Sequence, residues 1–424
     1  MLSLLKIRVS GYKLLEDCSE IDFLTKARVS ETGDDESEII EIADGLYSFN
    51  AIAITGSNAS GKSTTLNLIA NIIYLMKTGR WKNKPSDFKK DHIDLHIEFF
   101  INNLIYLYDS KIYPQNRSDF DIGSPYCLIK DEALKYAEYK PGVGKRYENE
   151  LDYRIDDISS GVEDTSILLF VCKDHLVGNY LNPFSINGVT VSNSFFESLN
   201  VFNENLTGEI VKLLDDSIEE IKYLGGDSVE FKRFSEPKLI LNRIQLLEQL
   251  SNGTIKGIEL YIRVVSLLKS GGILIVDEIE NCFHKNLVNN ILFLFMDKTI
   301  NKKNAQIIFS THYVEILDVF NRRDNIFIAH KIAGKVVLSN LYEDYDVRCE
   351  LSKSKRFNNN TFGTLLNYER SMNVKNLIKR ELSSICWIDG TNFNIQSPYL
   401  INCYWKQLLK LHIGNRLHDN IDVR

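Results

Sequence analysis

An eight-residue stretch, GSNASGKS at residues 56–63, constrains this chain more than any other feature, because it fits the pattern G-x-x-x-x-G-K-[ST]. A short apolar run of β-type residues precedes it (49–55), and a run with apolar residues at helical spacing follows it (64–76). A loop that binds phosphate needs backbone N–H groups that point inward and a following helix whose N-terminus faces the anion. Strand, loop and helix in this order therefore predict a nucleotide-binding P-loop.

Residues of this loop have distinct expected roles. Side chains in place of Gly56 and Gly61 would obstruct the approach of an anion to the backbone. Lys62 is expected to reach the β- and γ-phosphates of the nucleotide, and the Ser63 hydroxyl to ligate Mg²⁺. The residues expected to hold the nucleotide are Gly56, Ser57, Asn58, Ala59, Ser60, Gly61, Lys62, Ser63 and Thr64.

The composition is that of an ordinary soluble globular protein. With 424 residues, 44% of them hydrophobic, the chain can fill the cores of two or three packed units. A formal net charge of −7 argues against a protein that coats nucleic acid through bulk charge. Seven scattered cysteines without a C-x-x-C pair favour reduced thiols in the cytoplasm over disulfides or a zinc site. No window has the length of a membrane span, and the first residues predict a strand, not an export signal.

Strand patterns surround the loop. Residues 2–24 are predicted to form two short strands. Residues 93–101 alternate strictly between apolar and mostly polar side chains, and Asn102 and Asn103 follow as a turn before a second such run. This pattern predicts a β-hairpin.

Between residues 113 and 245 the periodicity weakens. Helices are expected near residues 165–174 and 205–216, and two strands after them, with the sequences IEEIKYL and SVEFKRF. No heptad pattern persists, so no long coiled coil is expected.

Two charged stretches leave alternatives open. Residues 31–45 contain seven acidic residues and no basic residue, as expected of a solvated loop or of an acidic docking surface. Residues 77–90 contain six basic residues, one acidic residue and two aromatic residues. These residues fit an exposed polar loop with a turn, or a surface that contacts a nucleic-acid backbone and stacks on bases.

A second motif, LSNGT at residues 250–254, leads into a helical pattern. Ser251 is a favourable N-cap, Gly253 lets the backbone approach an anion, and the helix behind them supplies a positive dipole end. Taken alone the motif is weak, because many helix starts share it.

Two adjacent carboxylates follow a buried-type strand. Residues 273–276 form an apolar run rich in β-branched side chains, and the run ends in Asp277 and Glu278. Such carboxylates at the carboxyl end of a strand are costly unless they serve a metal or a proton transfer. Asp277 is therefore expected to position Mg²⁺, and Glu278 to orient and polarise the attacking water.

A third polar group follows another buried-type strand. Residues 306–309 are apolar apart from the first, and Ser310, Thr311 and His312 come after them. A histidine at the carboxyl end of a strand can hydrogen-bond a γ-phosphate or the attacking water. His284, early in a helical pattern, is expected to be structural.

The four motifs GSNASGKS, LSNGT, ILIVDE and STH resemble, in their order and spacing, the ATP-binding-cassette-type (ABC-type) ATPases of the SMC, RecF and OLD group. The resemblance is closest to the stand-alone OLD-like (AAA15) ATPases of prokaryotic abortive-infection and phage-defence systems. It covers residues 1 to about 345 and, weakly, residues 357–363. It implies an α/β fold: an ABC-type P-loop ATPase head, with a mixed β-sheet, helices and an antiparallel β subdomain, that carries an α-rich insertion.

In this family the LSNGT-type loop is a signature that contacts the γ-phosphate of a nucleotide held by a second subunit. The resemblance therefore implies a homodimer or higher homo-oligomer closed through ATP sites, with Ser251, Asn252, Gly253 and Thr254 as nucleotide contacts across the interface. Asn252 and Thr254 depart from the residues usual in transporters.

The resemblance also implies the catalytic residues. Glu278 would be the hydrolytic carboxylate, His312 the switch histidine and Lys62 the phosphate-binding lysine. The glutamine that contacts Mg²⁺ in relatives cannot be identified in this sequence.

Four parts of the chain are expected from these motifs. They are an N-terminal lobe of the ATPase head with the P-loop (1–112), an insertion or lid lobe (113–245), a C-terminal lobe of the head (246–345) and an appendage that could dock a partner (346–424).

The absence of two features narrows the function. The insertion is too short for the antiparallel coiled-coil arm of a chromosome-organising protein, which needs hundreds of residues at about 1.5 Å per helical residue. The OLD nucleases carry a TOPRIM domain after the ATPase, whereas this chain offers only CWIDG at residues 386–390, with no D-x-D motif. We therefore expect a separate effector protein, a nuclease or toxin.

Three functions remain open. The first is an ATPase subunit of an anti-phage defence system that uses ATP and Mg²⁺ and controls the effector. The second is a DNA repair or recombination ATPase of RecF type, with the basic stretch on DNA. The third is a scaffold that binds ATP without hydrolysing it and holds a toxin inactive.

Overall fold

The computed structural model describes residues 2–29, 36–82, 84–115, 126–156, 161–176, 204–281, 283–345, 352–363 and 368–384. Contacts divide the chain into two units, Met1–Leu365 and Leu366–Arg424. The described part of the second unit is the helix α10 (Tyr368–Ser384). No helix in the described ranges is long and apolar enough to cross a membrane.

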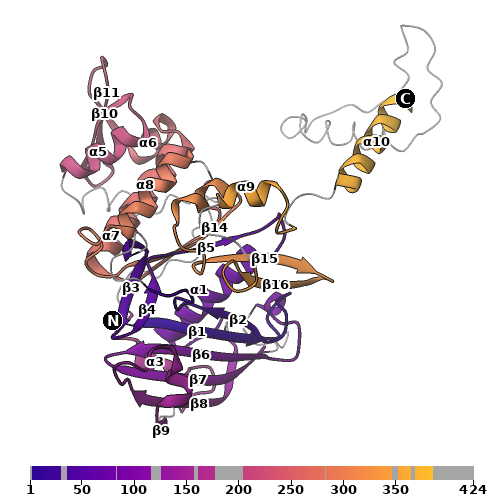
Figure 1. Cartoon of the computed structure of the whole chain (residues 1–424). Helices are drawn as coiled ribbons and strands as arrows, with labels where there is room; N and C mark the ends of the chain where they lie inside the picture. The colour runs from indigo at the N-terminus through magenta and orange to yellow at the C-terminus, as the bar shows by residue number, and fades with distance from the viewer. Residues whose placement is uncertain are drawn as a thin grey trace, which may run out of the picture. The chain divides into compact units, whose positions relative to one another are not determined.

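A five-stranded sheet forms the centre of the first unit, in the order β13-β14-β5-β15-β16 (Figure 1). Four of its strands are parallel, and β16 is antiparallel to β15 at the edge. The parallel strands end at one edge, where P-loop, carboxylates and histidine follow them. The bounds are β5 (Ala51–Thr55), β13 (Ile273–Val276), β14 (Gln306–Thr311), β15 (Ile326–Ile332) and β16 (Lys335–Asn340).

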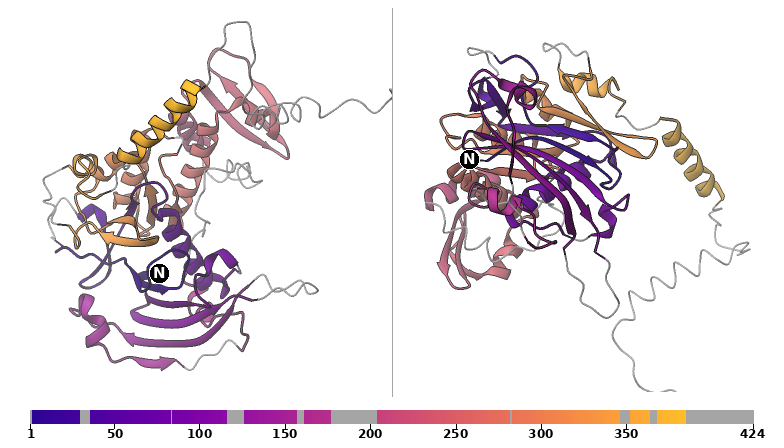
Figure 2. Two further views of the ribbon diagram at one scale, coloured as in Figure 1. Left: turned by 90° about the vertical axis from the view of Figure 1, so that its right-hand side faces the viewer. Right: turned by 90° about the horizontal axis from the view of Figure 1, so that it is seen from below.

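A second sheet is antiparallel and six-stranded, in the order β2-β1-β6-β7-β8-β9, and its strands run side by side as a curved layer (Figure 2). The hairpin of β6 and β7 is confirmed, with Asn102 and Asn103 both at positive φ, as a tight hairpin turn requires. The bounds are β1 (Ser3–Ser10), β2 (Ser19–Asp22), β6 (Ile93–Ile101), β7 (Leu104–Tyr113), β8 (Leu128–Glu138) and β9 (Arg154–Asp156).

Helix α1 (Lys62–Thr78) lies between the two sheets (Figure 1). Its buried side chains, which include Leu66, Ile69 and Ile73, share one core with Ile52 and Ile54 of β5 and with the apolar face of the antiparallel sheet. The helix is apolar on nearly all sides because both faces meet a sheet. This packing fixes the helix N-terminus, and with it the P-loop, at the end of β5.

The opposite face of the central sheet is covered by α7 (Asn252–Ser270) and α8 (Lys285–Met296). Ala51 and Ala53 of β5 contribute to this second core, whereas their neighbours Ile52 and Ile54 face α1. The alternation is that of a strand buried on both faces.

A smaller lobe consists of the three-stranded sheet β10-β11-β12 with two helices, and it packs on the N-terminal half of α7. The two strands and the helix expected here are confirmed. The described part of residues 113–245 nevertheless differs from the α-rich insertion expected, because it also supplies β8 and β9 to the antiparallel sheet, which runs past residue 112. The bounds are α5 (Glu204–Leu214), β10 (Ile218–Gly225), β11 (Ser228–Arg233), β12 (Leu239–Asn242) and α6 (Arg243–Gln249).

The acidic stretch is partly ordered structure, and the expectation of a solvated loop is wrong for residues 38–43. Ile39 and Ile40 are buried in β3, and the Glu38 side chain is 1% exposed and accepts backbone N–H groups of Asn321 and Arg322. The remaining short elements are η1 (Glu36–Glu38), β3 (Ile39–Ala43), β4 (Leu46–Phe49), η2 (Pro85–Asp87), η3 (Gly144–Arg146), α2 (Tyr147–Glu150), α3 (Leu168–Cys172), η4 (Val314–Val319) and α9 (Lys353–Asn358).

Candidate functional site

The P-loop connects β5 to α1 through two glycines with no room for a side chain. A Cβ on Gly56 would lie 2.4 Å from the Ala329 carbonyl oxygen, and one on Gly61 would lie 2.4 Å from the Val336 side chain. Both glycines have positive φ, 144° and 113°. Only glycine allows this close passage under β15 and β16. The first N–H groups of α1 have no partner within the helix, so they are available to an anion at this end.

Lys62 is buried at the start of α1 and folds back over the loop. Its Nζ donates to the carbonyl oxygens of Gly56, at 3.0 Å, and of Ser57, at 2.9 Å, and lies 3.3 Å from His312 Nδ1. Burial lowers the pKa of Lys62, and the charges of Asp277, Glu278 and Glu280 act against that lowering. The lysine therefore sits where it interacts with every carboxylate of the site.

The residues expected to hold Mg²⁺ have suitable chemistry. Mg²⁺ takes oxygen ligands and is commonly bound by one or two protein groups together with phosphate and water. Asp277 and Ser63 offer a carboxylate and an exposed hydroxyl, and the described residues contain no cluster of three or more histidine, cysteine or acidic side chains that could hold a metal alone. This donor set fits an ion that enters with a nucleotide.

Ser310 organises the two carboxylates, although no sequence motif assigned it a role. Its hydroxyl donates to Asp277 Oδ1 at 2.5 Å and accepts the backbone N–H of Glu278 at 2.7 Å. β13 and β14 are adjacent parallel strands, which is why Ser310, near the end of β14, meets the residues just beyond the end of β13. The available signal was a hydroxyl directly after the apolar run 307–309, but the sequence does not show that this run pairs with the strand that precedes Asp277.

Glu280 is a further acidic residue that was missed. Its side chain is 7% exposed, and Oε1 accepts the backbone N–H of His312 at 2.5 Å. Asn281 Nδ2, from the same turn, lies 3.3 Å from Glu278 Oε2. The sequence signal was the run E-x-E-N after the buried strand.

His312 lies between Lys62 and Glu278. Because a lysine ammonium only donates, Nδ1 of His312 acts as the acceptor, and the neutral ring then carries its proton on Nε2. Nε2 lies 3.6 Å from Glu278 Oε1. The structure thus joins three residues predicted from separate motifs into one chain of contacts.

The LSNGT stretch (250–254), called the signature stretch below, spans the start of α7. The Ser251 hydroxyl caps the helix by accepting the N–H of Thr254, as expected of an N-cap. Ser251 and Asn252 are exposed and Gly253 is half-buried, so this surface is open to a neighbour. Thr254 is 4% exposed, and its hydroxyl lies 2.7 Å from Ser251 Oγ. Within the chain, then, Thr254 supports the cap.

His284 and Trp81 have structural roles outside the site. His284 is the N-cap of α8 and accepts the N–H of Asn286. In the basic stretch the six Lys and Arg side chains are exposed, whereas Trp81 is 1% exposed and packs edge-on against Tyr12. Trp81 therefore offers no stacking surface. The CWIDG sequence at residues 386–390 lies outside the described residues.

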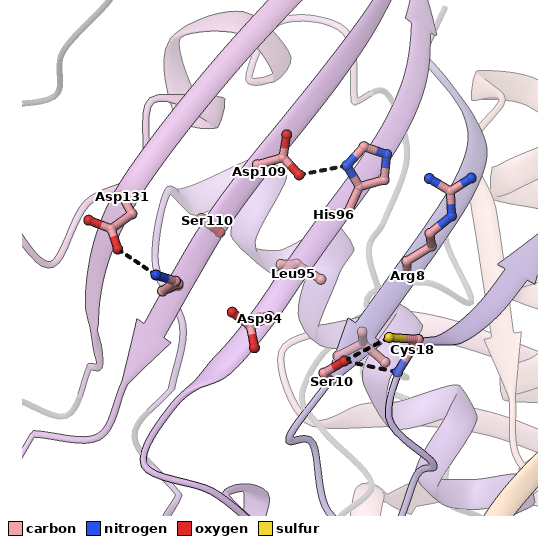
Figure 3. A pocket seen from close by; sticks show the side chains of 11 residues that line it. Arg8, Ser10, Cys18, Asp94, Leu95, His96, Asp109, Ser110 and Asp131 are labelled. Atoms are coloured by element: carbon pink, nitrogen blue, oxygen red, sulfur yellow. Dashed lines mark hydrogen bonds and ion pairs between the residues drawn. The ribbon is translucent and has the colours of Figure 1, made fainter. Parts of the chain in front are cut away.

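A pocket on the outer face of the antiparallel sheet is lined by residues of β1, β6, β7 and β8, most of them polar, and by Cys18 (Figure 3). Its charges pair with one another: His96 with Asp109, at 2.7 Å, and Lys111 with Asp131, at 3.0 Å. Arg8 pairs with Glu20 at 2.6 Å. The pocket contains none of the residues predicted from the P-loop, signature, acidic or histidine motifs.

One family model and one solved structure show similarity to this chain. The sequence model of the family described as "AAA domain, putative AbiEii toxin, Type IV TA system" matches residues 51–318, more than half of the chain. The SMC head domain from Thermotoga maritima aligns with 80% of this chain and 98% of its own length, at 14% identity and a TM-score of 0.36. No curated protein sequence shows significant similarity to the chain.

Proposed function

The chain belongs to the AAA-domain family whose description names an AbiEii toxin of a type IV toxin–antitoxin system, and from this premise we propose that it binds and hydrolyses ATP. The reaction would be the conversion of ATP and water to ADP and phosphate. The P-loop, Gly56 to Thr64, would hold the triphosphate with its backbone N–H groups and Lys62. Asp277 and Ser63 would hold Mg²⁺, which screens the phosphate charge when bound.

The observation that carries this proposal is the contact chain from Lys62 through His312 to Glu278. A protein that only stores a nucleotide needs the lysine and the loop. It does not need a carboxylate and a histidine at the same edge. Glu278 would orient the attacking water and accept its proton, and His312 would hydrogen-bond the γ-phosphate or the water.

Two copies would complete each other's sites. In this arrangement Ser251, Asn252 and Gly253 at the start of α7 would contact the nucleotide held by the partner's P-loop. The exposure of Ser251 and Asn252 supports this role, and so does the positive dipole end of the 19-residue helix behind them. ATP would then close a head-to-tail dimer, and hydrolysis would open it.

The wider role would be that of a sensor or regulatory subunit in anti-phage defence, acting in the cytoplasm beside a separate toxic effector. The family description supports a toxin–antitoxin context. The unit from Leu366 onward could dock the effector, because α10 exposes a row of apolar side chains at helical spacing: Val374, Leu377, Ile378 and Leu382.

Phosphate release by the purified chain tests the enzymatic part. Wild-type protein with ATP and Mg²⁺ is expected to release phosphate, and Glu278→Gln is expected to bind ATP without releasing it. Copurification from the native operon, followed by mass spectrometry, tests the effector. Recovery of a nuclease or toxin supports the regulatory role, and recovery of recombination proteins contradicts it.

A DNA-bound ATPase is the second candidate, and one observation favours it. The six basic side chains of residues 77–90 are all exposed, while the one acidic residue of that stretch, Asp87, is 1% exposed. The basic side chains of this stretch would contact the phosphates of the DNA backbone, without stacking on bases. DNA binding that weakens with salt and strengthens with ATP would support this candidate.

A scaffold that binds ATP without hydrolysing it is the third candidate. An ATP-bound oligomer without phosphate release would support it.

A further inference from the structure

Beyond the last paired residues of β13 and β14, polar contacts keep the two segments joined. The strand pairing ends at Val276 and Phe309. After it, the N–H of Ile279 donates to the Ser310 carbonyl at 3.0 Å, and the Ser310 hydroxyl bridges Asp277 and Glu278. The contact of Glu280 with His312 is the last in this series.

A tight turn brings Glu280 back toward β14. Glu278 adopts a positive φ of 52°, and the N–H of Asn281 donates to the Glu278 carbonyl at 2.8 Å. Such a conformation is unfavourable for a residue with a side chain, so the surrounding contacts must maintain it. The turn presents Glu278 to the His312 ring and Glu280 to the His312 backbone.

The carboxylate of Glu280 is buried, and only one of its two oxygens is satisfied. Its Oε1 accepts the His312 N–H, whereas Oε2 is buried and has no hydrogen-bond partner among the described residues. Burial of a carboxylate with one oxygen unsatisfied costs free energy. A backbone N–H could be satisfied by any neutral acceptor. What this position requires is therefore an acceptor oxygen for the His312 N–H, and the charge of the carboxylate is not needed for the contact.

We propose that Glu280 is a positioning residue that fixes the His312 backbone and thereby holds the imidazole between Lys62 and Glu278. The inference rests on the function proposed above for His312. Glu280 would act through His312 and not through a contact of its own with the nucleotide. Its Oε1 accepts the His312 N–H and so fixes the backbone just after β14. The imidazole then reaches both neighbours, with Nδ1 at 3.3 Å from Lys62 Nζ and Nε2 at 3.6 Å from Glu278 Oε1.

Two substitutions separate positioning from bulk packing. Glu280→Met keeps the volume of the side chain and removes the carboxylate acceptor, whereas Glu280→Gln keeps an acceptor oxygen and removes the charge. We expect Glu280→Met to lower kcat for ATP hydrolysis about 100-fold, because misplacement of a catalytic group by about 1 Å has this effect. In Glu280→Met, KM and ATP affinity should stay within about threefold of wild type, because Glu280 makes no contact of its own with ATP. Glu280→Gln should keep kcat within about threefold of wild type, because it retains the acceptor oxygen.

Two kinetic results would overturn the proposal. One is wild-type kcat in a folded Glu280→Met variant. The other is a Glu280→Gln variant as slow as Glu280→Met, because the charge and not the acceptor would then matter. Thermal unfolding of each variant establishes that it is folded, and Glu280→Ala replaces Glu280→Met if the methionine is not tolerated.

A second readout does not depend on turnover. The ¹⁵N shifts of the His312 ring, assigned by comparison with His312→Ala, report the tautomer. Wild type and Glu280→Gln should show the Nε2–H form, and Glu280→Met should lose it. Unchanged shifts in Glu280→Met would overturn the proposal. Wild-type protein that shows these shifts and yet releases no phosphate would contradict the ATPase function and leave the positioning role intact.

Discussion

Lys62 Nζ lies 3.3 Å from His312 Nδ1, although 250 residues separate the two in the chain. The contact joins the first residue of α1 to the end of β14. A ligand that draws the lysine toward phosphates would release Nδ1 of the histidine. P-loop occupancy would then be communicated directly to the residue beside Glu278.

Removal of the Lys62 side chain should abolish most nucleotide binding. Lys62→Ala loses a charge-assisted contact to phosphate, so ATP affinity should fall about 10- to 100-fold. Lys77→Ala is the matched control, because Lys77 is exposed in the last turn of the same helix. Equilibrium binding of a fluorescent ATP analogue measures both. Equal affinities of the two variants would remove Lys62 from the site.

Neutralisation of Glu278 should separate binding from hydrolysis. Glu278→Gln should bind ATP and lose about 100-fold or more in kcat, because the group that accepts the proton of water is gone. Its ATP-bound form should persist as a dimer in size-exclusion chromatography with light scattering. Glu315→Gln, at an exposed position in η4, is the control and should hydrolyse normally. Unaltered turnover in Glu278→Gln would exclude the proposed role.

His96 should make stability depend on pH. Burial lowers the pKa of His96, but hydrogen bonds to Asp109 and Glu98 outweigh burial and raise the pKa to about 9. Figure 3 shows the contact with Asp109. Arg8 also faces this group, at 3.4 Å from Glu98. A histidine with a raised pKa stabilises the fold fully below pH 6.5, and the contribution is lost as pH rises to about 9.

The contribution at stake is up to about 3 kcal/mol of unfolding free energy. Urea unfolding between pH 6 and 9.5 should show this loss in wild type and a flatter profile in His96→Asn. Asp109→Asn, which leaves Glu98 as a partner, should give an intermediate slope. Parallel profiles for wild type and His96→Asn would show that the ion pairs contribute nothing.

The sequence predicted the parts of the site that depend on local pattern. The P-loop, the strands 273–276 and 306–309 and the N-cap at Ser251 were found because each is encoded within a few residues. Glu280 and Ser310 were missed because their roles depend on which strands are neighbours, and a sequence pattern does not give strand order. The acidic stretch was misjudged because Glu38 is buried by residues 321–325, far along the chain.

The segment after η4 should be essential for stability. Asp324 is fully buried and accepts the N–H groups of Lys26 and Ala27, and it pairs with the buried Arg322. Asp324→Ala would leave Arg322 without its main counter-charge, so unfolding free energy should fall by about 3 to 5 kcal/mol. Asp318→Ala at an exposed position nearby should cost less. A loss below about 1 kcal/mol for Asp324→Ala, measured in urea, would contradict this account.

The central claim is that each ATP site combines the P-loop of one copy with the signature stretch of another. Lys62→Ala and Ser251→Arg should each be inactive alone, because one lacks the phosphate contact and the other blocks the interface. In a mixed dimer, the intact P-loop of the Ser251→Arg copy would meet the intact Ser251 of the Lys62→Ala copy. Phosphate release by an equal mixture of the two variants is therefore the most direct measurement. With random pairing, half of the dimers are mixed and each has one intact site, so about a quarter of wild-type activity should return. A mixture as inactive as its components would contradict the account.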